Sequence, residues 1–201
     1  MTPTGFDRPP LLLVKSDGKS FQCWDPVVYT GSKFDSWTIP EGFTTDFATI
    51  PACVSWAIPK LGAYTLAAIV HDLLCTGLND WYEAAQASGP KYADNTLTVG
   101  VGLHYKGRLV TWPTANAVDT DAIFYKIARE VGTDPVTARL LWVGVRWGAL
   151  ANPARREGWF RPKVMLPVLG WSLVFAPVLV PATVLAVVGQ GILKVARWLA
   201  R

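Results

Sequence analysis

Residues 61–75, LGAYTLAAIVHDLLC, form the stretch on which the fold prediction rests. Alanine and leucine dominate it, Pro59 precedes it and Gly77 follows it, which predicts an α-helix that ends at a left-handed glycine. His71 and Asp72 are polar side chains in this mostly apolar segment. Because successive side chains of a helix project about 100° apart, we expect the two residues to serve separate partners.

Two further helices are predicted downstream. In residues 118–131 apolar side chains recur at helical spacing, and Asp121 opens the apolar stripe. Asp134 and Pro135 are typical of a helix start, as the N-cap and the first-turn proline, so a third helix is expected from there to about Gly148.

The segments around these helices predict β structure. Residues 11–50 contain short apolar or aromatic runs separated by turn residues, which is typical of short strands. Residues 78–116 are interpreted as an insertion, with a β-hairpin over 96–112. The sequence thus predicts an α+β fold. It has N-terminal short β-strands, a core of about three helices with an inserted β-hairpin, and a C-terminal apolar membrane-type helix or helical hairpin.

Composition excludes several classes of protein. The 201 residues suffice for about one domain. Hydrophobic residues make up 51% and charged residues 17%, which argues against a disordered chain. Three cysteines without a C-x-x-C pair and two histidines argue against a disulfide scaffold or a zinc site.

The positive charge is concentrated near the C-terminus. Residues 150–201 hold seven basic residues and one acid, a charge of +6, which leaves −2 on residues 1–149 of a chain with net charge +4. These basic residues flank an apolar segment, whereas nucleic-acid-binding proteins gather theirs on one face of a domain. We therefore expect anionic lipid as the partner and no nucleic acid.

The apolar segment itself predicts membrane association through residues 164–201. Residues 164–193 contain no charged side chain, and as a helix they would measure about 45 Å, against about 30 Å of hydrocarbon. Three prolines, at 167, 177 and 181, leave three alternatives open: one tilted transmembrane helix, a re-entrant hairpin, or a buried hairpin in a larger assembly. The expected organisation is a domain over 1–152, a basic linker over 153–163 and the membrane-associated tail.

Four polar residues are candidates for chemistry. If Asp121 accepts a hydrogen bond from one nitrogen of His71, the other nitrogen is left free as a base. Asp72 and Asp46 are candidates for a hard cation such as calcium, which prefers carboxylate and carbonyl oxygens. The alternative is structural: His71 and a carboxylate would join two helices, Asp46 would cap a turn, and Asp121 would face a helix dipole.

The chain resembles a family encoded by phages and prophages and catalogued as domain of unknown function 1353. The resemblance rests on WTIPEGFTTDFATIP at 37–51, AAIVHDLL at 67–74, TDAIF at 120–124 and ARLLWVGVRWG at 138–148, and it covers about residues 20–150. Cys75 stands where the family usually has tyrosine, and Thr49 replaces the usual serine. Asp94 is an alternative to Asp121 as the family's aspartate.

The order of these motifs is similar to that of small calcium-dependent phospholipases of the A2 type. That resemblance implies that His71 activates water, Asp72 binds calcium and Asp121 orients His71. The disulfides, the glycine-rich calcium loop and the tyrosine of those enzymes have no counterpart here.

Two functions are therefore expected from the sequence. The first is a phage-derived structural or accessory protein with a buried His/Asp cluster. It would reside in the host inner membrane with its N-terminal domain cytoplasmic, or in the virion, with phage assembly proteins as partners. The alternative is a calcium-dependent, phospholipase-like hydrolase with His71 as general base. Calcium is the one candidate cofactor, and no other is expected.

Overall fold

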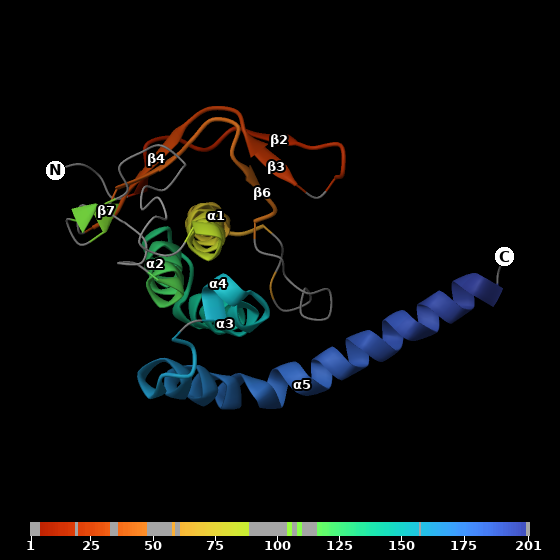
Figure 1. Ribbon diagram of the computed structural model, residues 1–201. Coiled ribbons are helices and arrows are strands. Elements are labelled where there is room, and N and C mark those ends of the chain that lie inside the picture. The colour runs from red at the N-terminus through yellow and green to blue at the C-terminus, as the bar shows by residue number, and fades with distance from the viewer. Residues whose placement is uncertain are drawn as a thin grey trace.

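The computed structural model confirms a mixed α+β fold, with two small antiparallel sheets beside a group of helices and a long C-terminal helix (Figure 1). The residues that it describes are 5–18, 20–32, 36–47, 58, 61–88, 104–105, 108–109, 116–156 and 158–199. Asp94 and Thr49 lie outside these ranges.

The first sheet has five strands in the order β1-β4-β5-β7-β8. Their bounds are β1 Gly5–Phe6, β4 Val27–Thr30, β5 Ser36–Ile39, β7 His104–Tyr105 and β8 Arg108–Leu109. The last two pair with each other antiparallel, which confirms the centre of the predicted hairpin; the rest of 96–112 lies outside the described residues. Alternate residues of β4 and β5 are buried, with Val27, Tyr29, Trp37 and Ile39 in the core, as expected for strands with one covered face.

The second sheet has three strands in the order β2-β3-β6, with bounds Leu12–Val14, Phe21–Cys23 and Thr44–Thr45. Strand β6 contacts helix α1, Thr65–Ser88, which lies between the sheets and the other helices (Figure 1). This contact brings the turn after β6, with Asp46 and Phe47, beside the middle of α1.

The predicted end of the first helix at Gly77 is wrong, because α1 continues to Ser88. Gly77 is buried, Leu78 belongs to the core, and Trp81 and Tyr82 pack against it. A glycine inside a helix costs only about 1 kcal/mol relative to alanine, and the burial of these larger side chains exceeds that cost.

The second and third helices are confirmed. Helix α2 covers Ala117–Glu130 and begins with a capping box between Asn116 and Asp119. Helix α3 covers Pro135–Gly148, with Asp134 as its N-cap and proline in its first turn. A short 3₁₀ turn, Ala149–Ala151, leads into α4, Pro153–Arg156, which contacts both α1 and α2. Arg155 is thereby held against the domain.

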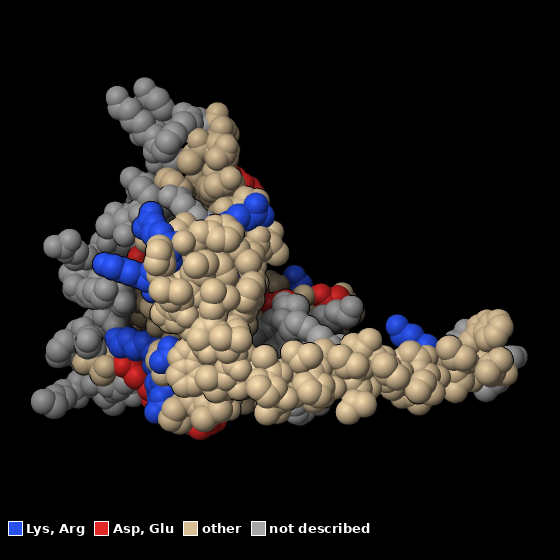
Figure 2. Space-filling view, turned by 90° about the horizontal axis from the view of Figure 1, so that it is seen from below, with Lys and Arg blue, Asp and Glu red and all other residues tan. Residues whose placement is uncertain are grey.

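The tail is a single helix, α5, Pro162–Leu199, so the hairpin alternative is wrong. It contains all three prolines, and its axis bends along its course (Figure 1). Its N-terminal part packs on α3, whereas residues from Val184 onward extend away from the domain. Figure 2 shows mostly uncharged side chains along it, with Lys and Arg near the domain and again toward the far end of the tail. Among the described residues it is the one helix that is long and apolar enough to span a membrane, which by itself is weak evidence that it does so.

Candidate functional site

The centre of the site is the pair of His71 and Asp121, which the packing of α1 on α2 brings together. His71 Nε2 lies 2.7 Å from Asp121 Oδ1, and the ring of His71 also packs on Phe124. Both side chains are buried, at 6% and 0% exposed. The structure therefore contains the contact that we expected between Asp121 and one imidazole nitrogen.

Asp121 also binds two arginines. Arg146, from α3, donates from NH1 to Oδ2 at 2.6 Å, and Arg155, from α4, donates from NH2 to Oδ1 at 2.9 Å. Arg155 donates from the same nitrogen to the carbonyl of Val145 at 3.1 Å. Sequence reasoning missed both arginines. The run at 138–148 is apolar apart from Arg139 and Arg146, and nothing local shows that Arg146 is the one that is fully buried.

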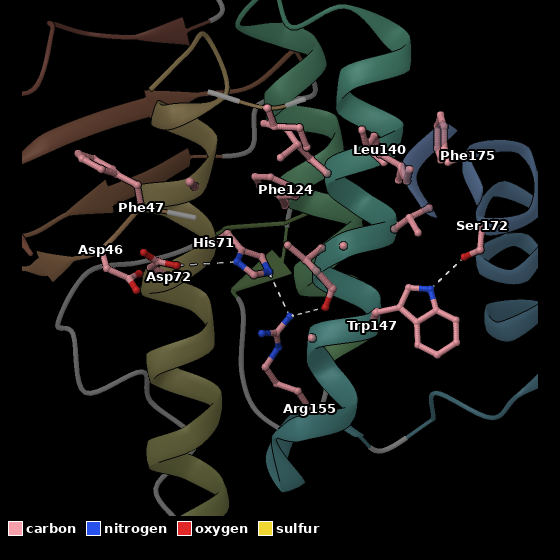
Figure 3. A pocket seen from close by; sticks show the side chains of 18 of the residues that line it. Asp46, Phe47, His71, Asp72, Phe124, Leu140, Trp147, Arg155, Ser172 and Phe175 are labelled. Carbon is pink, nitrogen blue, oxygen red and sulfur yellow. Dashed lines mark hydrogen bonds and ion pairs between the residues drawn. The ribbon is translucent and has the colours of Figure 1, made fainter. Parts of the chain in front are cut away.

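The other side of the imidazole faces Asp72. Nδ1 of His71 lies 4.0 Å from Asp72 Oδ1 (Figure 3), and Cys75 Sγ lies 3.8 Å from Nδ1. Asp72 Oδ2 accepts a hydrogen bond of 2.5 Å from Thr45 Oγ1, which itself accepts one from the backbone N–H of Phe47. Phe47 has a φ of 63°, which is rare for a bulky residue. The turn that carries Asp46 is thus attached to α1 beside His71.

The surroundings shift three pKa values. Burial alone would lower the pKa of His71, but Cys75 and Asp121 raise it to about 10. Burial raises the pKa of Asp72 to about 7, against the Thr45 hydrogen bond and the charge of His71, with Asp46 adding to the rise. Burial also acts to raise the pKa of Asp121, but His71, Arg155 and Arg146 outweigh it and lower that pKa. Asp121 is therefore the ionised acceptor, and His71 Nε2 donates to it.

A cavity of about 740 Å³ opens beside the pair. His71, Asp72, Asp46 and Arg155 lie on its wall, and most of its remaining lining is apolar side chains of α3 and α5 (Figure 3). Asp121 does not line it and stands behind His71. The structure thus brings His71, Asp72 and Asp46 to one cavity and places Asp121 where it can orient the imidazole.

The donor set for calcium is incomplete. Asp72 and Asp46 share the cavity wall, but one oxygen of Asp72 is engaged by Thr45. Calcium takes about 6–8 oxygen ligands, and the described ranges contain no group of three or more His, Cys, Asp or Glu that could hold a metal. The described residues do not by themselves form a calcium site, and the role expected of Asp72 and Asp46 stays a prediction.

The shifted pKa values predict how stability depends on pH. The raised pKa of His71 stabilises the fold below its ordinary value of 6.5, and this contribution is lost as pH rises toward about 10. The lowered pKa of Asp121 stabilises the fold above its ordinary value of 3.8, and this contribution is lost as pH falls below that. Urea unfolding of the wild type and of His71→Gln from pH 5 to about pH 10 should show an alkaline loss that is smaller in the variant. Equal losses would contradict the assignment.

Comparison with known proteins agrees with this core. The model of the family described as "Protein of unknown function (DUF1353)" matches residues 21–145. The match contains Asp46, His71, Asp72 and Asp121 and ends before Arg146, Arg155 and α5. No curated protein and no solved structure matches the chain. Because the matched region is more than half of the 201 residues, the chain belongs to the DUF1353 family of proteins of unknown function.

Proposed function

We propose that this protein is a membrane-associated hydrolase of lipid esters in which His71 is the general base. One observation carries the proposal: an imidazole oriented by a buried aspartate lies on the wall of a large, mostly apolar cavity. A structural ion pair needs no cavity beside it, whereas a base must reach its substrate. The cavity also borders α5, the helix with the length and composition of a membrane span.

The chemistry follows from the two faces of the imidazole. Nε2 donates to Asp121, which fixes the ring, and Arg146 and Arg155 keep that carboxylate ionised. Nδ1, on the side of Asp72, removes a proton from water as the water oxygen bonds to the ester carbonyl carbon. The ester C–O bond then breaks, and His71 returns the proton to the leaving alcohol.

Replacing His71 tests this proposal. Loss of a general base lowers rates by about 10²–10⁴-fold, so His71→Gln should lower fatty-acid release from anionic phospholipid vesicles by about that factor. Wild-type release should increase with pH toward about 10, because Nδ1 must lose its proton. His104→Gln, which changes the other histidine of the sequence, is the matched control. Parallel reactions with calcium and with chelator test the calcium prediction.

A second candidate is a phage-derived structural or accessory protein that associates with a membrane or with assembly proteins through its tail. The observation in its favour is that Asp121 is fully buried and holds three cationic side chains from three other helices. Such a cluster can fix how the helices pack without taking part in any reaction. If folded, vesicle-bound protein releases no fatty acid, this candidate is favoured over the hydrolase. The protein would then reside in the host inner membrane or in the virion.

A further inference from the structure

We propose that the cavity is a binding site for a single-chain anionic amphiphile, with its carboxylate at Arg155 and its chain between α3 and α5. A long-chain fatty acid has this chemistry. The inference deepens the proposed function, because a fatty acid is what ester hydrolysis would release. The role of the site as a product site therefore rests on that function. Binding itself requires no catalysis, so the two can be tested separately.

The apolar part of the cavity suits a hydrocarbon chain. Its volume of about 740 Å³ falls within the range of about 300–1,000 Å³ that is usual for small-molecule sites. One wall is α3 and the facing wall is the N-terminal part of α5, with Leu140, Val143, Gly144, Phe175, Ala176 and Leu179 among the lining residues. Trp147 Nε1 donates to Ser172 Oγ at 2.9 Å and ties the two walls together at its edge.

Arg155 provides the anionic end of the site. Its NH2 group is committed to Asp121 and to the carbonyl of Val145. Its Nε is buried and has no hydrogen-bond partner among the described residues. A buried donor without a partner costs about 1–3 kcal/mol, and a planar guanidinium matches a carboxylate better than other cations do. Because the Arg155 side chain lines the cavity, a ligand carboxylate at this end would meet its positive charge.

The carboxylates on the cavity wall set the orientation of the ligand. Asp72 and Asp46 lie to one side of His71 and Arg155 to another (Figure 3). An anionic group is repelled by the first side and attracted by the second, and its chain then points toward the apolar residues. The membrane is the source of such a ligand, because α5 is both a wall of the cavity and the helix that continues away from the domain.

The test is a binding measurement on the full-length protein in non-ionic detergent. The probe is cis-parinaric acid, a fluorescent long-chain fatty acid, with its methyl ester as the uncharged counterpart. Saturable binding of the acid, at least about tenfold tighter than that of the ester, is expected from a charged hydrogen bond. Arg155→Gln should remove that preference. Arg156→Gln should retain it, because this neighbouring arginine is exposed, does not line the cavity and donates to Leu150.

A second variant covers the possibility that Arg155→Gln does not fold. Ala176→Trp fills the cavity from α5 and leaves the cluster around Asp121 intact, so it should abolish saturable binding of the acid. Equal binding of acid and ester by the wild type, or undiminished binding by Ala176→Trp, would overturn the inference. Acid-specific binding without ester hydrolysis would support this site and remove the proposed activity. Hydrolysis without acid-specific binding would support the proposed activity and overturn this binding site.

Discussion

Replacing Asp121 with alanine is expected to destabilise the folded domain by about 3–5 kcal/mol, the cost of removing one partner from a buried ion pair. The variant leaves Arg146 fully buried without its carboxylate. Nε and NH2 of Arg146 already have no hydrogen-bond partner among the described residues, and NH1 would keep only the carbonyl of Ala117, at 3.5 Å. His71 and Arg155 lose the same acceptor.

The matched control is Asp119→Ala, two residues earlier on α2. Asp119 is partly exposed and takes part in the capping box with Asn116, so its loss should cost about 1 kcal/mol. Urea unfolding of both variants at neutral pH, in the same detergent, measures the difference. If the two variants lose the same stability, Asp121 does not hold the cluster together.

Arginines placed in the free part of α5 are expected to release the protein from membranes. The helix of 38 residues measures about 57 Å, nearly twice the hydrocarbon thickness, and its N-terminal part is packed on α3. Each arginine at the centre of a spanning helix costs about 2.5–3.5 kcal/mol. Leu185→Arg and Val188→Arg should therefore each weaken membrane association by about a hundredfold or more.

Flotation with anionic vesicles checks this expectation. Ala196→Arg is the matched control, because it adds the same charge between Lys194 and Arg197, at the basic end of the helix. The control should float with the vesicles like the wild type. Should the variants at 185 and 188 float equally well, α5 would not be the part of the chain that enters the bilayer.

Local sequence patterns were sufficient to predict the helices, because their signals lie within the segments themselves. The Asp134 cap and the proline after it mark the start of α3, and the apolar stripe marks α2. The same reasoning gave the wrong end for α1 and left the form of the tail open. Whether a helix continues past Gly77, or through Pro177 and Pro181, depends on what its flanking side chains bury against, which a local pattern does not contain.

For the candidate site, too, local patterns predicted some features and did not contain others. Helical spacing and composition were enough to predict that His71 and Asp121 lie on separate apolar helices and that a long uncharged segment follows the domain. That Arg146 and Arg155 both bind Asp121, and that α3 and α5 enclose a cavity at His71, became evident from the folded structure. Helical periodicity acts over a few residues, whereas buried charge pairs and cavities arise where distant segments pack together.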